Sequence, residues 1–322
     1  MRIPLKKLAH GLTLATVFSC LIACGQKKYE GIPNTNTGGG SGTVDNSPPP
    51  PETWQEHWFE HRQLVKRVYY DSLLALYLDD DVNRGSTTWL TKLIKDTWQY
   101  TRKEYNYGYG PSPRLFAVFH ADKYGGGHPA YYFDAGHDYR NVIDCGLGGK
   151  DAWLNQTWQE RNIIIHEIGH IVESASLNTK GSPAFKIWGD SKWCEIYIYD
   201  VYKGLGREEE AKKLYDEMMV QTDNFPRAGT QWFKNWFYPI YENYGKTKVL
   251  VNFFAMLKAH FPKDASNKFT RDMNWGEFIH FWSGAAGVNL KAQATIAFGW
   301  PAEYEAQFTK AQSDFPLVPY TR

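Results

Sequence analysis

Residues 158–176 read Trp-Gln-Glu-Arg-Asn-Ile-Ile-Ile-His-Glu-Ile-Gly-His-Ile-Val-Glu-Ser-Ala-Ser, with the pattern H-E-x-x-H at positions 166–170. Two histidines four residues apart project from the same face of a helix, so both imidazoles can hold one metal ion. Glu167 would lie beside that metal, where its carboxylate can take a proton from a metal-bound water. We therefore predict that His166 and His170 bind a metal and that Glu167 is catalytic.

The residues around this pattern predict a buried helix. Thr157 and Glu160 match the capping box, so a helix should begin near Trp158 and end near Ser176. Isoleucine, valine and alanine recur from position 163 to position 175, which predicts burial around most of the circumference. One polar stripe interrupts this apolar surface, formed by Asn162, His166, His170 and Glu173. A single stripe of metal-competent side chains on a buried helix favours a metal site over two histidines of an ordinary core.

The start of the chain predicts export. Basic residues at positions 2, 6 and 7 precede an apolar stretch that is too short to span a bilayer convincingly. The stretch ends in Leu21-Ile22-Ala23-Cys24, which resembles the bacterial lipobox. That resemblance implies removal of a signal peptide over 1–23 and attachment of lipid to Cys24, which anchors the protein without spanning the membrane. We expect the protein at the bacterial cell envelope, on the outer membrane or the cell surface. The alternatives are a plain secretory signal that is cut elsewhere and a short membrane anchor.

Residues 24–51 have the composition of a disordered tether. Positions 38–42 read Gly-Gly-Gly-Ser-Gly, which is flexible, and positions 48–51 are four prolines, which form a stiff extended run. The remainder is long enough for one large domain or two closely associated lobes. We divide it into an N-terminal, metal-binding lobe over 52–205 and a helical C-terminal lobe over 206–322.

The pattern along the folded part predicts an α+β, mainly helical protein with a small sheet. Apolar spacing predicts helices over 54–78 and 89–105. Apolar runs predict strands over 114–119, 131–133 and 141–145, with a mobile loop at the glycines 125–127. After Gly181, helical spacing returns over 207–221, 232–244, 246–260, 274–285 and 301–312. The metal helix should therefore lie between the sheet and a helical lobe.

Two histidines leave a catalytic zinc one protein ligand short. Glu173 lies on the same stripe as His170, but a continuing helix would carry it away from the metal, so we expect it to support the site from outside the ligand shell. Asp190 precedes a predicted helix, and we expect it to cap that helix. Glu195 lies in a strongly apolar element, where an unpaired carboxylate is costly to bury. We therefore predict Glu195 as the third ligand. The alternative is an ion pair with a lysine or arginine.

H-E-x-x-H followed about 25 residues later by a glutamate on a second helix resembles the gluzincin branch of zinc metallopeptidases. Metzincins are disfavoured, because Glu173 and Ser176 stand where that branch has glycine and histidine. Within the gluzincins, the residues around His170 and Glu195 look most like the enhancin-like peptidases, which include bacterial surface enzymes acting on mucin-type glycoproteins. The resemblance covers about residues 158–203. It implies a zincin-like small sheet with the active-site helix, a Zn²⁺ ion and a protein or glycoprotein substrate.

The composition limits the classes of partner. The formal net charge is +1, so there is no electrostatic case for nucleic acid. Aromatic residues make up 16% of the chain, and some of them could line a groove for sugars or peptide side chains. A non-catalytic surface lipoprotein that binds glycans or proteins, with a structural or vestigial metal site, would account for the anchor and the aromatics equally well. It does not explain a glutamate between two histidines at metal-binding spacing.

Two cysteines remain for the mature chain after Cys24, namely Cys145 and Cys194. Disulfides persist in exported proteins, but only the number of these cysteines supports a pair, so their pairing stays open. Cys194 or Glu173 could instead close the metal site as a fourth ligand. A site closed in this way would be structural rather than catalytic.

Overall fold

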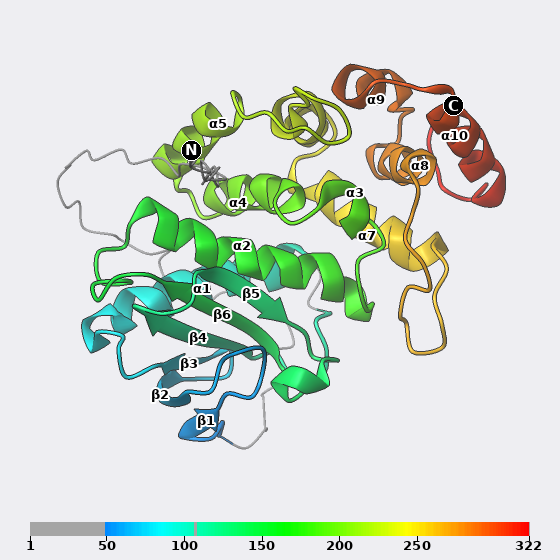
Figure 1. Ribbon diagram of the computed structural model, residues 1–322. Coiled ribbons are helices and arrows are strands. Elements are labelled where there is room, and N and C mark those ends of the chain that lie inside the picture. The colour runs from blue at the N-terminus through cyan, green and yellow to red at the C-terminus, as the bar shows by residue number, and fades with distance from the viewer. Residues whose placement is uncertain (1–48, 106–107, 322) are drawn as a thin grey trace, which may run out of the picture. The chain divides into compact units, whose positions relative to one another are not determined.

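A mixed sheet and a larger set of helices build the computed structural model, which describes residues 49–105 and 108–321 (Figure 1). The predicted signal peptide over 1–23, the predicted lipidation site Cys24 and the predicted tether as far as residue 48 lie outside the described residues. Within the described part of the chain, no helix is both long and apolar enough to cross a membrane.

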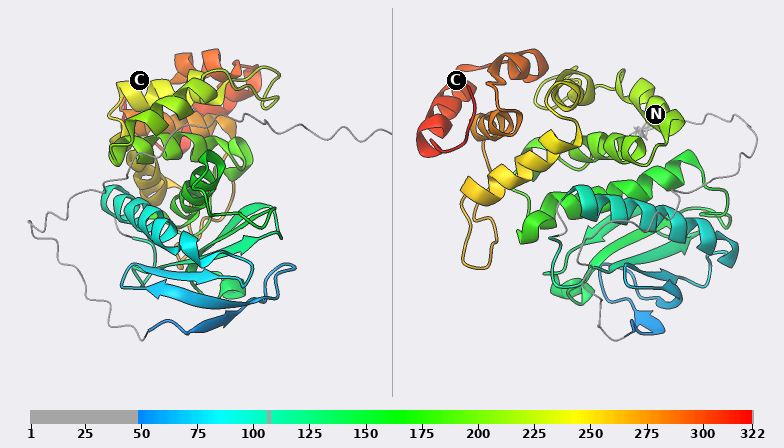
Figure 2. Two further views of the ribbon diagram at one scale, coloured as in Figure 1. Left: turned by 90° about the vertical axis from the view of Figure 1, so that its left-hand side faces the viewer. Right: turned by 180° about the vertical axis from the view of Figure 1, so that it is seen from behind.

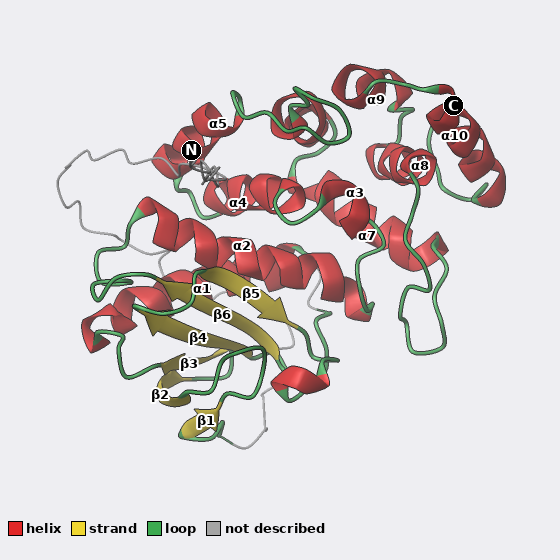
Figure 3. Cartoon of the chain, in the orientation of Figure 1, coloured by secondary structure: helices red, strands yellow, loops and turns green. Residues whose placement is uncertain are grey.

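The fold is α+β and mainly helical, as predicted (Figure 3). The strands are β1 (Thr53–Gln55), β2 (Leu64–Tyr70), β3 (Leu74–Leu78), β4 (Leu115–Ala121), β5 (Gly126–Ala130) and β6 (Asn141–Leu147). The α-helices are α1 (Thr87–Glu104), α2 (Trp158–Ala175), α3 (Phe185–Trp188), α4 (Lys192–Gly204), α5 (Glu208–Met218), α6 (Tyr238–Asn243), α7 (Thr247–His260), α8 (Trp275–Ala286), α9 (Lys291–Phe298) and α10 (Ala302–Asp314). Short 3-10 turns are η1 (Arg84–Ser86), η2 (Ala135–His137) and η3 (Ser176–Asn178), and a π-helical turn, η4, covers Phe233–Phe237.

The sheet has six strands in the order β1-β2-β3-β4-β6-β5. The strands β3, β4 and β6 run parallel in its centre, and β5 pairs antiparallel with β6 at one edge. Helices α1 and α2 lie on one face of the sheet, and the C-terminal helices lie beyond α2 (Figure 2). The opposite face carries a smaller apolar cluster that contains Trp54, Trp58, Phe116 and Val118. The sheet therefore has two buried faces with different surroundings.

Helix α2 begins and ends where the sequence predicts. The Thr157 hydroxyl accepts a hydrogen bond from the Glu160 backbone N–H (3.2 Å), and the Glu160 carboxylate accepts one from the Thr157 N–H (2.6 Å), which completes the capping box. The predicted strands over 114–119 and 141–145 and the predicted helix over 89–105 are also confirmed, as β4, β6 and α1. Helix α9 was not predicted.

The predicted helix over 54–78 is wrong, because this segment forms β1, β2 and β3. Residues 74–78 are all buried, so they show no alternation that would mark a strand. The chain reverses at Asp71, whose carboxylate accepts hydrogen bonds from the backbone N–H groups of Leu73 (2.8 Å) and Leu74 (2.9 Å). The apolar positions matched helical spacing without reflecting a helix.

The predicted loop at 125–127 and strand at 131–133 are also wrong, because the strand β5 covers Gly126–Ala130 instead. Glycines carry no hydropathy pattern, so this strand left no signal in the sequence. Gly127 is required by close packing: a Cβ atom there would lie 2.6 Å from the Oε1 atom of Glu167 on α2. Because Gly127 has no side chain, helix α2 can approach the edge of the sheet.

One buried carboxylate joins helices from both predicted lobes. Asp200 on α4 is fully buried. It accepts hydrogen bonds from the hydroxyls of Tyr100 (2.9 Å), Tyr105 (2.7 Å), Tyr241 (3.0 Å) and Thr247 (2.6 Å). A buried charge is tolerated only when donors surround it, so this network fixes α4 against its neighbours. All described residues belong to one compact unit, which includes both predicted lobes.

We expect Asp200→Ala to lower the free energy of unfolding by about 3 kcal/mol, because two buried and two partly buried hydroxyls lose their acceptor. Urea unfolding followed by tryptophan fluorescence measures this change. Asp314→Ala is the matched control, since Asp314 pairs with Lys310 on the surface of α10 (2.9 Å) and should change stability by less than about 0.5 kcal/mol. Equal losses in the two variants would contradict the role given to Asp200.

Candidate metal centre

The predicted histidine pair lies together on one face of α2. The Nε2 atoms of His166 and His170 are 3.1 Å apart. Burial is the main cause that lowers the pKa of His166 to about 4, so its ring is neutral at pH 7. A neutral imidazole is the form that binds a metal.

Glu173 sets the orientation of His170. Its Oε2 atom lies 2.9 Å from His170 Nδ1. Its Oε1 atom accepts hydrogen bonds from the Ser182 hydroxyl (2.7 Å) and the Trp188 indole N–H (2.6 Å). The carboxylate favours a proton on Nδ1, which leaves the Nε2 lone pair directed toward His166. Glu173 thus contacts the outer nitrogen of His170, and its role outside a ligand shell stays a prediction.

Asp190 brings a carboxylate to the same place. Its Oδ1 atom lies 3.4 Å from His170 Nε2, and its Oδ2 atom lies 3.9 Å from His166 Nε2. Donor atoms around a tetrahedral zinc are about 3.3 Å apart, given metal–ligand distances near 2 Å. The three side chains are therefore spaced as ligands of one metal would be. The expected capping role is not observed, because the N-cap of α4 is Ser191 and no side-chain cap hydrogen bond forms there.

Glu195 makes the ion pair that was the alternative to metal binding. On α4, its carboxylate lies 3.8 Å from Lys192 Nζ, and Lys192 also contacts Asp223 (2.8 Å). These three side chains and Trp232 line a pocket of about 260 Å³. Burial raises the pKa of Glu195 to about 7. Among the described residues, neither Glu195 nor Asp190 belongs to the group of mutually close ligand atoms that contains the histidines, but Asp190 comes within 4 Å of both histidines. The role of Glu195 as a ligand stays a prediction.

Cys145 and Cys194 are both buried and both free, so they form no disulfide in this structure. The Cys194 Sγ atom and one ring nitrogen each of His166 and His170 lie within 4.8 Å of one another. The thiol donates to the backbone carbonyl of His166 (3.4 Å). Burial raises the pKa of Cys194 to about 12, which keeps the thiol protonated at neutral pH. Cys194 is thus near enough to be a ligand, but its thiol is hydrogen-bonded to the backbone of α2.

Glu167 lies beside the histidines in a buried position. Its Oε2 atom has no hydrogen-bond partner within the described residues, and its side chain packs on Gly127 of β5. Burial raises the pKa of Glu167 to about 8. A carboxylate with a raised pKa and an unused oxygen can accept a proton at neutral pH and return it later.

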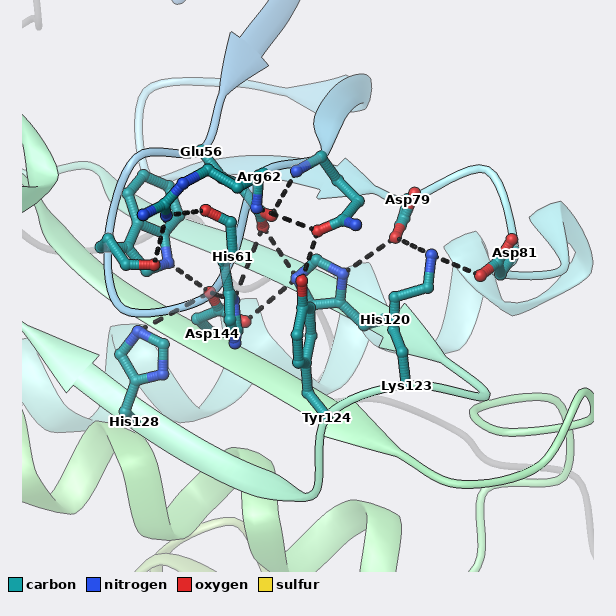
Figure 4. A network of polar contacts seen from close by, with 12 residues as sticks. Glu56, His61, Arg62, Asp79, Asp81, His120, Lys123, Tyr124, His128 and Asp144 are labelled. Carbon is teal, nitrogen blue, oxygen red and sulfur yellow. Dashed lines mark hydrogen bonds and ion pairs between the residues drawn. The ribbon is translucent and has the colours of Figure 1, made fainter.

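A second group of potential ligands lies on the opposite face of the sheet. It consists of Glu56, His61, His120 and Asp144, whose ligand atoms all lie within 4.8 Å of one another (Figure 4). The structure therefore contains a buried group of histidine and carboxylate side chains that could hold a metal ion, in addition to the group on α2. The sequence offered only a weak signal for it, since His120 and Asp144 interrupt otherwise apolar strands.

Solvent exposure separates the two groups. The side chains of His166 and Asp190 are 22% and 79% exposed, whereas those of Glu56, His120 and Asp144 are 0% exposed. Catalytic metal sites keep one position open to substrate, and structural sites are closed. By this criterion only the group on α2 can meet a substrate.

Comparisons with known proteins do not identify the chain. No family model matches it, and no curated protein matches it. It is similar to the crystal structure of a functionally unknown conserved protein from Bacillus anthracis str. Ames, with a TM-score of 0.43 and 13% sequence identity. That match covers 74% of this chain and 50% of the other, so the chain spans half the length of that relative.

We expect Glu173→Gln to weaken zinc binding about 10- to 100-fold, because the neutral amide holds the His170 ring less firmly. Competition with a chromogenic zinc chelator measures the affinity. Glu217→Gln is the matched control, since Glu217 also accepts a hydrogen bond from an indole, that of Trp158 (2.9 Å), but is not among the metal-binding groups. An unchanged affinity in Glu173→Gln would contradict this role.

Proposed function

We propose that this protein is a zinc metallopeptidase that hydrolyses proteins or glycoproteins at the bacterial cell envelope. The observation that carries the proposal is the convergence of His166, His170 and Asp190 beside Glu167, whose carboxylate is buried and has an unpartnered oxygen. The location at the envelope rests on residues 1–24, which lie outside the described part.

The donor set suits zinc. Two imidazole nitrogens and one carboxylate oxygen make up one of the usual three-ligand sets of catalytic zinc, and the exposed side of Asp190 leaves room for a fourth, exchangeable position. We assign Asp190 as the third ligand in place of Glu195, because Asp190 lies within 4 Å of both histidines and Glu195 pairs with Lys192. The contact from Glu173 to His170 is the kind of outer support that zinc ligands use.

The chemistry follows from the position of Glu167. When bound, zinc supplies Lewis acidity and a water of lowered pKa. Glu167 accepts a proton from the attacking water and then delivers it to the nitrogen of the leaving amine. Its burial keeps bulk water away from this proton.

Strand β5 offers a place for an extended substrate. It lies at the edge of the sheet next to α2, and among the described strands it pairs only with β6. A substrate chain could hydrogen-bond to the open edge as an added strand. Gly127 lies against Glu167, so a chain on this edge would pass the proposed base.

A neighbouring pocket offers a place for a substrate side chain. It measures about 270 Å³ and includes Asp190, Trp188, Phe225 and Trp232 in its lining. Phe225 is 46% exposed, and the pocket thus presents aromatic surface next to the proposed metal ligand. Aromatic faces accept apolar side chains and sugar rings, which is compatible with a protein or glycoprotein substrate.

We expect Glu167→Gln to retain zinc at the α2 site and to lose about a thousandfold in hydrolysis, since general-base catalysis is removed while the ligands stay. Zinc content and cleavage of a panel of proteins and mucin-type glycoproteins measure the two properties. Glu217→Gln, away from the site, should retain both. A wild-type protein that holds zinc at the α2 site yet cleaves nothing in the panel would favour a non-catalytic surface lipoprotein.

The third ligand is tested by comparing Asp190→Ala with Glu195→Ala. We expect Asp190→Ala to weaken zinc binding at least about a hundredfold and Glu195→Ala to leave it within about threefold, because only Asp190 approaches the histidines. Zinc titration with a competing chelator gives both values. The reverse ranking would restore Glu195 as the ligand. A large loss in Cys194→Ser alone would indicate a closed structural site.

A further inference from the structure

The group on the far face of the sheet is assembled from three separate parts of the chain. His120 is the last residue but one of the fully buried strand β4, and Asp144 lies on the neighbouring strand β6. Glu56 and His61 belong to the segment over 56–63 that joins β1 to β2 and folds over the sheet (Figure 4). No local sequence pattern unites these residues, because strand register and the connecting loop bring them together.

Three atoms of this group lie within ion-pair distance of one another but form no hydrogen bond. His120 Nε2 lies 2.8 Å from Glu56 Oε1 and 3.2 Å from Asp144 Oδ1. All three atoms are buried, and none of them has a hydrogen-bond partner in the described part of the chain. Both distances are short enough for a hydrogen bond, so it is the angles at these atoms that are unsuitable for one. Side chains that converge in this way point to a common centre rather than to each other.

The remaining polar atoms of the same side chains are already occupied. His120 Nδ1 lies 3.1 Å from Asp79 Oδ2. Asp144 Oδ2 accepts a hydrogen bond from the Trp58 indole (2.8 Å) and lies 2.9 Å from His61 Nδ1. Glu56 Oε2 accepts one from the Gln63 backbone N–H (3.0 Å). Of the polar atoms of these three side chains, only the three converging atoms are left without a hydrogen bond.

The arrangement repeats the one on α2. There a carboxylate, Glu173, occupies Nδ1 of His170 and leaves Nε2 for the centre. Here Asp79 occupies Nδ1 of His120 in the same way, and Lys123 holds Asp79 in place (2.8 Å). A carboxylate on the outer nitrogen is the usual support for a metal-binding histidine.

Charge favours the same conclusion. The side chains of Glu56 and Asp144 are fully buried, and their contacts with His61 and His120 compensate the two charges only where these imidazoles carry a proton. A divalent cation between them neutralises both. The presence of two imidazoles in the group favours a first-row transition metal such as zinc over magnesium or calcium, which prefer oxygen ligands.

We propose that Glu56, His61, His120 and Asp144 bind one divalent transition-metal ion in a closed, structural site. The ion fastens the segment over 56–63 to the centre of the sheet. The ion would also lie close to β5, because His128 Nε2 on this strand is 3.6 Å from Asp144 Oδ2. The site does not depend on the function proposed for α2.

Metal content of the purified full-length protein tests this proposal. After dialysis against buffer with micromolar zinc and removal of loosely bound metal, elemental analysis should find about two zinc ions per chain. A double variant, His166→Ala with His170→Ala, should retain one. In that background Asp144→Asn, which is isosteric and keeps the oxygen that Trp58 contacts, should weaken the remaining site at least about a hundredfold.

Asp138→Asn is the matched control. Asp138 also accepts a hydrogen bond from an indole, that of Trp54 (2.7 Å), and contacts a histidine, His57 (3.2 Å), but it is partly exposed and is not among the converging ligands. It should leave the metal content unchanged.

The proposal is overturned if the double variant, folded by circular dichroism, binds no zinc, cobalt or manganese at micromolar concentration. The cluster would then be a hydrogen-bonded network only. Failure of the function proposed for α2 would look different, because wild type and double variant would then hold the same single ion. Hydrogen exchange supplies a measurement without any substitution: metal removal should speed exchange in residues 56–63 of the wild type at least about tenfold.

Discussion

The contact between a buried carboxylate and the outer nitrogen of a histidine is the interaction on which the candidate centre depends. An imidazole on a helix can rotate and can place its proton on either nitrogen. The carboxylate of Glu173 removes both freedoms from His170, because it accepts from Nδ1 and is itself fixed by Ser182 and Trp188. Without this contact, two histidines at helical spacing would be only two polar groups in a core.

The same principle explains why so many ionisable groups can be buried in this protein. Asp200 is surrounded by hydroxyls, Glu173 by an imidazole, a hydroxyl and an indole, and Asp79 by an imidazole and an ammonium group. In each case donors replace the water that burial removes. Glu167 departs from this rule, because one of its buried oxygens has no partner among the described residues. Glu56 and Asp144 each have one buried oxygen without a hydrogen-bond partner in the same way, and these departures mark the two candidate metal sites.

The sequence predicted the features that local signals determine. The capping box at Thr157, the polar stripe on α2 and the supporting place of Glu173 all follow from residues within one helix, and the structure has them there. The general class, α+β and mainly helical, was also predictable from periodicity. The segment over 54–78 was misassigned because buried strands such as β3 carry apolar residues on both faces, so their pattern does not distinguish strand from helix.

Features that depend on distant parts of the chain could not be predicted in this way. Asp190 reaches the histidines because of the turn between α3 and α4, which no spacing rule describes. Likewise, Glu56 and Asp144 meet because a loop folds across a sheet whose strand order was unknown. A carboxylate near a metal motif in the sequence, such as Glu195, is therefore a weaker indication than one whose oxygen lies near the motif in space.

Strand β5 contacts the candidate metal groups on both faces of the sheet. Neighbouring residues of a strand point to opposite sides, and here Gly127 lies against Glu167 while His128 lies near Asp144. A slip of this strand by a single residue would turn the imidazole into the space that α2 needs and would leave the far face without it. The pairing of β5 with β6 thus has one register that suits both the group on α2 and the group around Asp144. Shifting β5 by one residue in either direction would suit neither group.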